Sequence, residues 1–189
     1  MAYKVITPPP VEPITVAEFR LHQRLDPDDT TENTAIEGFI SAAREWTELY
    51  IGFAVAEQTV ELALDAYPSG AVALEGGPVS AVTSVKYLDA SGVEQTLSNA
   101  LYALDDYSTP NWLTMAYGTY WPATYAAANA LKVRYVIGTG TVAASIKAAM
   151  LLLAGHLYEN REEVSSVQNY AVPMGVKALL SLHRVNMGL

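Results

Sequence analysis

Two glycines after a strand-like run have the spacing of a phosphate-binding turn. Gly138, Gly140 and Ala143 fit the pattern G-x-G-x-x-A between the apolar run Leu131–Ile137 and an apolar helical segment. In a dinucleotide-binding protein, such glycines let the backbone approach a pyrophosphate at the start of a helix. That fold also needs a second parallel strand after the helix, with an acidic residue near its end for the ribose. No apolar strand follows here, so a nucleotide-binding enzyme is the least favoured alternative, and a plain strand-to-helix turn is the expected structure.

The histidines and paired carboxylates, which could serve acid–base chemistry or bind a metal, lie apart. His22, His156 and His183 include no pair at the i, i+4 spacing of a helical metal site. Asp105 and Asp106 are adjacent at an expected strand end, so their side chains should point to opposite faces. The sequence contains no cysteine and no G-x-S-x-G nucleophile motif. We therefore expect no catalytic residues, no metal site, no cofactor and no enzyme activity.

Aromatic residues in a predicted loop form a third candidate site. Four of them lie close together: Tyr117, Tyr120, Trp121 and Tyr125. Exposed tyrosine and tryptophan side chains can stack on sugars or anchor a protein interface. The sequence leaves three interpretations open: a cap on the neighbouring strands, a carbohydrate-binding β module, or a contact with a partner protein.

The composition predicts burial against other protein. Only 16% of the 189 residues are charged, against roughly 25% in typical soluble domains, and the mean hydropathy is +0.15. The longest apolar run, residues 148–155, is far shorter than the roughly 20 residues that span a bilayer. The N-terminus continues into prolines instead of a signal-peptide core. We therefore expect no membrane association, and we expect the apolar surface to be buried in an obligate oligomer.

The charge argues against specific binding to nucleic acid. Acidic residues number 20 against 11 basic ones, a net charge of −9, and the basic residues form no cluster in the sequence. Attraction to phosphates depends on Lys and Arg side chains that displace counterions. A negative surface would instead let DNA slide past without adhering.

The elements that carry these residues follow from capping signals and periodicity. Residues 7–13 contain four prolines and should form an extended arm. Thr15 and Glu18 have the capping-box spacing that opens a short helix. A second helix should span residues 31–50, with Gly52 as its C-cap.

The middle of the chain changes to a two-residue period, which is typical of strands. Alternating runs and a hairpin-type turn predict strands at 59–64, 82–88, 93–97, 102–104, 112–115 and 131–137. Two further helices should follow at 143–162 and 174–184. We therefore predict an α+β fold, with a small bundle of two N-terminal and two C-terminal helices around an antiparallel β insert. The single domain would comprise a helical body, 1–52 and 139–189, and the insert, 53–138.

Six sequence segments together carry a resemblance to a known family. They are ITVAEFRLH (14–22), FISAAREWTELYIG (39–52), PVSAVTSVKY with DASGVEQTL (78–87 and 89–97), YGTYWPAT (117–124), AAMLLLAGHLYENRE (148–162) and PMGVKALL (173–180). In this order they cover nearly the whole chain. The chain resembles the head-tail connector family of long-tailed bacteriophages and phage-like particles, whose members are also called adaptor or head-completion proteins.

The resemblance implies a structural virion protein without a catalytic site. Members of the family form a ring, typically twelvefold, beneath the portal protein, with the helical bundle building the ring. The ring joins the head to the tail, continues the DNA channel and receives the next neck, stopper or tail component. It would be assembled in the bacterial cytoplasm and reside at the head-tail junction of the virion, with DNA passing through it without specific binding. Carried over to this chain, the portal contact would be the C-terminal segment: Arg184, Val185, Asn186, Met187, Gly188 and Leu189.

Overall fold

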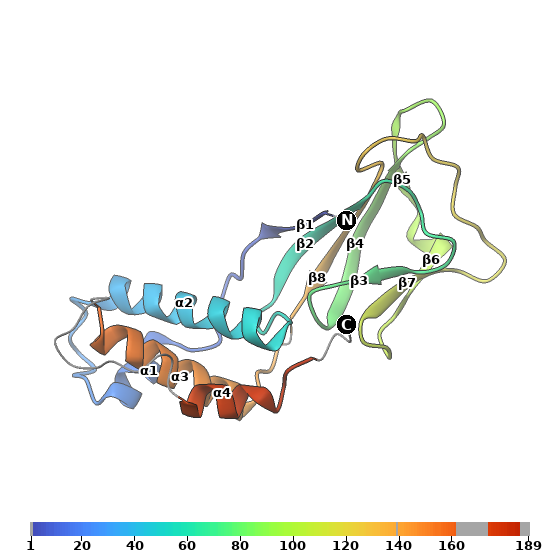
Figure 1. Ribbon diagram of the computed structural model, residues 1–189. Coiled ribbons are helices and arrows are strands. Elements are labelled where there is room, and N and C mark those ends of the chain that lie inside the picture. Colours follow the sequence, from blue (N-terminus) through green and yellow to red (C-terminus); the bar gives the residue numbers. More distant parts are fainter. Residues whose placement is uncertain (1, 139, 162–173, 186–189) are drawn as a thin grey trace. The chain divides into compact units, whose positions relative to one another are not determined.

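The computed structural model describes residues 2–138, 140–161 and 174–185, and the chain divides into two compact units (Figure 1). The first unit comprises Met1–Pro10 and Ala56–Gly140, and we call it the sheet unit. The second comprises Val11–Val55 and Thr141–Leu189, and we call it the helical unit. None of the helices in the described ranges is both long enough and apolar enough to span a membrane.

The helical unit contains four helices: α1 (Val16–Gln23), α2 (Asn33–Ile51), α3 (Ala144–Glu159) and α4 (Met174–Ser181). The capping box predicted for α1 is present, because the Thr15 Oγ1 atom accepts from the Glu18 N–H at 3.1 Å and the Glu18 carboxylate accepts from the Thr15 N–H at 2.8 Å. Gly52 ends α2 with a φ of 87°, as predicted for its C-cap.

The helices pack through buried apolar side chains, and α2, α3 and α4 lie side by side in Figure 1. On α2, the buried residues Ile36, Ile40 and Ala43 recur at helical spacing. They form one core with Phe19 of α1 and with apolar residues of α3 and α4: Ile146, Ala149, Met150, Leu153, Ala154, Val176 and Leu180. Complete burial stabilises each large apolar side chain by about 1.5–3 kcal/mol, so this core holds the unit together.

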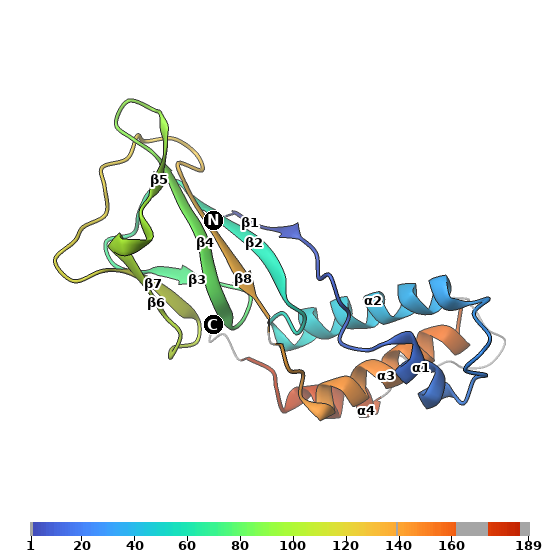
Figure 2. The ribbon, with the colours of Figure 1, turned by 180° about the vertical axis from the view of Figure 1, so that it is seen from behind.

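The sheet unit contains two antiparallel sheets. The five-stranded sheet has the order β1-β2-β8-β4-β5, and the three-stranded sheet has the order β3-β7-β6. The strands are β1 (Ala2–Thr7), β2 (Gln58–Leu64), β3 (Val72–Leu74), β4 (Val79–Leu88), β5 (Glu94–Leu97), β6 (Tyr102–Asp105), β7 (Asn111–Met115) and β8 (Leu131–Ile137), with a short 3₁₀ helix at Asn99–Leu101. Figure 2 shows β2, β8 and β4 side by side from behind.

Strand β8 organises the larger sheet because it pairs with β2 on one side and with β4 on the other. Leu131, Val133, Tyr135 and Ile137 are buried, whereas the residues between them are partly exposed. This alternation puts one face of the sheet in the core and the other toward solvent. The buried Asn111 side chain joins the two sheets, since its Oδ1 atom accepts from the Val79 N–H at 2.9 Å.

The α+β class is confirmed, with four helices and antiparallel sheets among the described residues. Two strands were not predicted: β1 and β3. Strand β1 pairs with β2, so residues 2–7 belong to the sheet although the sequence analysis placed them in the helical body. Of the arm predicted at residues 7–13, Thr7 is the last residue of β1, and residues 8–13 contain no helix or strand.

Candidate assembly surfaces

The glycine junction after β8 is a tight backbone turn. Gly138 has a φ of 102°, and its N–H donates to the Pro78 carbonyl at 3.1 Å. A Cβ atom at this position would overlap the carbonyl group of Ala56, so only glycine fits. All strand pairs in the described residues are antiparallel, and the described element after α3 is a helix. The described part of the chain therefore lacks the βαβ unit that a dinucleotide site requires.

The three histidines lie apart from one another and form no common site. The His183 Nε2 atom lies 2.6 Å from the Ser145 hydroxyl, the His156 Nδ1 atom lies 3.3 Å from the Asn160 amide nitrogen, and His22 is exposed. Within the described ranges, no group of three or more His, Cys, Asp or Glu residues has the arrangement of a metal site. Asp105 caps a turn instead, accepting from the Tyr107 N–H at 3.0 Å.

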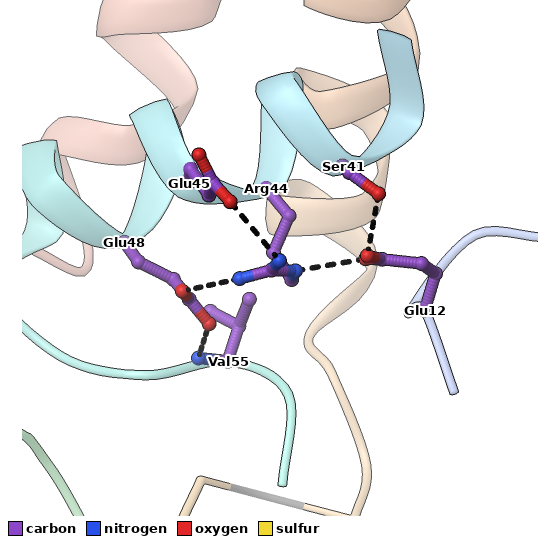
Figure 3. Close-up of polar contacts among 6 residues, drawn as sticks. All are labelled: Glu12, Ser41, Arg44, Glu45, Glu48 and Val55. Carbon is purple, nitrogen blue, oxygen red and sulfur yellow. Dashed lines mark hydrogen bonds and ion pairs between the residues drawn. The ribbon is translucent and has the colours of Figure 1, made fainter. Parts of the chain in front are cut away.

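A buried arginine of α2 is the centre of a polar cluster in the helical unit (Figure 3). The Arg44 guanidinium contacts the Glu12 carboxylate at 2.8 Å and the Glu48 carboxylate at 2.9 Å. Each carboxylate has a second partner: Glu12 accepts from the Ser41 hydroxyl at 2.8 Å, and Glu48 accepts from the Val55 N–H at 2.9 Å. Burial alone would lower the pKa of Arg44, but hydrogen bonds and the two negative charges raise it on balance. Through Glu12, Arg44 holds the proline-rich segment against α2, and through Glu48 it holds the segment after α2 at Val55.

A second polar cluster joins the start of α2 to the end of α3. The Glu32 carboxylate accepts from the Tyr158 hydroxyl and pairs with Arg161 at 2.7 Å. The hydrogen bonds from Tyr158 and Arg161 lower the pKa of Glu32. The Arg161 guanidinium lies 4.7 Å from the Tyr158 ring centroid, and the Phe39 and Phe19 rings meet the same tyrosine edge-on. These contacts therefore hold the end of α3 against the start of α2.

The predicted aromatic loop separates into one inward and three outward residues. Trp121 stacks on Tyr67 with ring centroids 4.5 Å apart, and its indole N–H donates to the Gly70 carbonyl at 2.9 Å. Tyr117 and Tyr120 are 106% and 87% exposed, and Tyr125 is 51% exposed. The loop is also fixed near both ends: the Thr119 N–H donates to the Ala116 carbonyl near its start, and the Tyr125 N–H donates to the Leu88 carbonyl at its end. It is a preorganised surface that presents tyrosines.

The C-terminal segment starts against the end of α2. The Val185 N–H donates to the Ile51 carbonyl at 3.0 Å, and the Arg184 guanidinium lies 5.6 Å from the Tyr50 ring centroid. The other four residues of the predicted portal contact, Asn186, Met187, Gly188 and Leu189, lie outside the described residues.

Large apolar side chains are exposed on the helical unit. They are Val11, Leu21, Leu49, Leu152, Met174 and Leu182. Helix α3 is apolar on most of its circumference, and a helix of this kind is normally covered on all sides. On its outer side, Ala144, Ala148 and Leu152 follow at four-residue spacing, with Leu152 40% exposed. We call these three residues the α3 outer face.

Exposed apolar and tyrosine surfaces are features of proteins that assemble with other proteins. The chain belongs to the head completion protein family, which it matches over residues 12–185. No match was found among curated proteins.

Three solved structures are similar to this chain over its full length. The first is the virion of the native gene transfer agent (GTA) particle, with a TM-score of 0.80 and 27% identity. The others are the neck of the empty GTA particle computed with C6 symmetry (TM-score 0.76, 27% identity) and the neck of the native GTA particle computed with C12 symmetry (TM-score 0.77, 25% identity). Each likeness covers 100% of this chain and 98% of the other. Membership of the head completion protein family and the similarity to these three structures confirm the resemblance inferred from the sequence.

Proposed function

We propose that the protein is a structural virion component that forms a ring at the head-tail junction, joins the head to the tail and continues the DNA channel. The single observation that carries the proposal is the likeness, over essentially the whole of both chains, to proteins in the neck of a phage-like particle. Membership of the head completion protein family supports the same role. A twelvefold ring agrees with the C12 symmetry of one of these necks.

The helical unit builds the ring in this proposal, and both units act as one connector domain. The α3 outer face supplies the apolar contact, since an exposed leucine on a helix that is apolar nearly all round is stabilised by covering. A chain with only 16% charged residues has the composition expected when much of its surface is buried by neighbours.

The other two contacts of the ring use the segments identified above. We assign the portal contact to the C-terminal segment, Arg184 to Leu189, because its start is fixed by the hydrogen bond from the Val185 N–H to the Ile51 carbonyl. We assign the contact with the next neck or tail component to Tyr117, Tyr120 and Tyr125, because they are exposed on a fixed loop. Rigid, exposed tyrosines bind partners at little cost in side-chain entropy.

Carbohydrate binding is the alternative use of the aromatic loop. Trp121 would be the strongest sugar-stacking residue, but one face of its indole is covered by Tyr67. Tyr67 therefore removes one of the two indole faces on which a sugar could stack, which favours a protein partner.

Electron microscopy of the purified protein, alone and mixed with its portal protein, tests the proposed ring. We expect closed rings with a central channel, or axial complexes in which the ring caps the portal. Single copies under both conditions, at concentrations well above those in an infected cell, would contradict the proposal.

A further inference from the structure

All four basic residues of the sheet unit lie on one face of its five-stranded sheet. Lys4 of β1 lies opposite Glu61 of β2, which lies opposite Arg134 of β8. Residues directly opposite each other on antiparallel strands point to the same face, as do residues two apart on one strand. Lys132 therefore shares this face with Arg134, and Lys86 of β4 shares it because it lies opposite Lys132.

Two carboxylates lie among these cations. Glu94 pairs with Lys86 at 2.9 Å and with Lys132 at 3.3 Å, so one carboxylate bridges two lysines that face each other across strands. Glu61 pairs with Arg134 at 2.7 Å. The hydrogen bonds from the two lysines lower the pKa of Glu94. We call these six residues the cationic sheet face: Lys4, Glu61, Lys86, Glu94, Lys132 and Arg134.

The cationic sheet face contrasts with the rest of the chain. It carries four basic and two acidic residues, a net charge of +2, whereas the remaining 7 basic and 18 acidic residues sum to −11. Its long side chains are accessible, since those of Lys86, Lys132 and Arg134 are 44%, 41% and 41% exposed. Two hollows adjoin Lys132, one lined by Lys4 and Glu61 and the other by Lys86 and Glu94. The charged groups therefore lie at the edges of hollows that a side chain of a partner can enter.

We propose that the cationic sheet face docks on an acidic surface of a neighbouring copy of the same chain. This inference rests on the proposed ring, because a head-to-tail ring brings two different surfaces of identical chains together. The complementary charge is present in the chain itself, with −11 outside this face. The Lys86–Glu94–Lys132 bridge shows that the face accommodates carboxylates between its lysines. DNA is a poorer occupant, since Glu61 and Glu94 would repel phosphates and a net charge of +2 releases few counterions.

Two substitutions at one ion pair separate docking from a structural role. Lys132→Gln and Glu94→Gln each remove the Lys132–Glu94 pair, which is exposed and contributes little to stability. Docking predicts opposite effects on the protein concentration needed for half-maximal ring assembly. Lys132→Gln removes a cation from the face and should raise this concentration about threefold. Glu94→Gln removes a carboxylate from the face and should lower it by a similar factor. Assembly would be followed by light scattering and mass photometry at low salt, and high salt should reduce the difference between the variants.

A third variant controls for overall charge. Glu37→Gln removes a carboxylate from the exposed side of α2, outside the cationic sheet face. If general repulsion between copies limited assembly, this variant would tighten the ring as Glu94→Gln does. Docking predicts no tightening from it, because the removed charge lies on the acidic part of the surface.

Cross-linking tests the contact directly. When copies with light and heavy isotope labels are mixed and treated with a carbodiimide, Lys86 or Lys132 of one copy should become joined to carboxylates of another copy.

The outcomes distinguish this inference from the proposed function. In one outcome, the wild type forms rings while Lys132→Gln and Glu94→Gln shift the assembly concentration in the same direction or leave it unchanged. That result would overturn the docking inference and leave the proposed ring intact. Opposite effects seen only in fluorescence anisotropy with duplex DNA, and not in assembly, would also overturn it in favour of a DNA contact. Absence of rings in the wild type would overturn the proposed function, and the inference with it.

Discussion

At the scale of single residues, Gly138 shows how backbone geometry selects one amino acid. Its φ of 102° and its approach to the Ala56 carbonyl leave no room for a side chain. Gly138→Ala should therefore destabilise the protein by more than about 2 kcal/mol, through left-handed strain and overlap with the backbone. The matched control is Gly140→Ala, because a Cβ atom there meets no other atom within 4 Å. Urea unfolding of the two variants checks the prediction, and equal stabilities would contradict it.

Arg44 is the residue whose loss should be most costly among the charged groups. Arg44→Met would leave the partly buried carboxylates of Glu12 and Glu48 without their cation, at an expected cost of about 3 kcal/mol. The matched control is Lys86→Met, which breaks an ion pair between two exposed side chains and should cost less than about 1 kcal/mol. Thermal unfolding monitored by circular dichroism compares the two. A larger loss for Lys86→Met would refute the assigned role of Arg44.

The capping box of α1 makes a pH-dependent contribution. The hydrogen bond from the Thr15 N–H and the contacts with Lys147 hold the pKa of Glu18 below its usual value of 4.5. A lowered folded-state pKa adds stability above pH 4.5, and this stability is lost as the pH falls through the folded-state value. The glutamine of Glu18→Gln can still accept from the Thr15 N–H but carries no charge. Wild type should therefore exceed Glu18→Gln by roughly 0.5 kcal/mol at pH 7, and the gap should close as the pH falls below 4.5 and through the folded-state pKa. A gap that stays constant from pH 7 to pH 3 would disagree with this assignment.

At the scale of elements, strong periodicity was the reliable guide. Helix α2 and strand β8 were predicted to within two residues, because each buries one regularly spaced set of apolar side chains. Strand β1 was missed since its exposed Tyr3, Lys4 and Val5 do not alternate in polarity, and its partner β2 is more than 50 residues away. Strand β3 has only three residues, too few to show a period.

The polar clusters were also beyond prediction from the sequence. Glu12 and Arg44 are 32 residues apart, and Glu32 and Arg161 are 129 apart, so nothing local joins them. The aromatic loop was predicted as a group, but the inward turn of Trp121 depends on Tyr67 and Gly70, which are more than 50 residues away in sequence.

The α3 outer face is the element on which ring formation depends in our proposal. Leu152→Glu should prevent ring assembly while changing the free energy of unfolding of the single copy by less than about 1 kcal/mol, because the side chain is already 40% exposed. Leu21→Glu, at an 81% exposed leucine of α1, is the matched control and should assemble normally. Size-exclusion chromatography with light scattering measures the mass of the assembly that each variant forms. Normal rings from Leu152→Glu would remove α3 from the interface.

The C-terminal segment offers a second test at this scale. Truncation after His183 removes the anchor at Val185 together with the four residues that follow, and it should abolish portal binding while the protein stays folded. Truncation after Val185 keeps the hydrogen bond to Ile51 and removes only residues 186–189. If the last four residues make the contact, both truncations lose portal binding in a pull-down assay. Full binding by both would cancel the assignment.

At the scale of the whole molecule, the chain combines few charges, a negative net charge and exposed apolar patches. A protein with 16% charged residues and a net charge of −9 can bury its apolar faces between copies and still present an acidic surface to DNA. The composition alone indicated an oligomer. The order of six segments was needed to indicate a head-tail connector, and family membership over residues 12–185 agrees with it.

The most direct test of the proposed function is deletion of this protein from a particle-producing host, followed by electron microscopy and by addition of the purified protein. We predict that filled heads and separate tails accumulate without it, and that the purified wild type restores joined particles whereas Leu152→Glu does not. Complete tailed particles formed in the absence of the protein would contradict its role as the joint between head and tail.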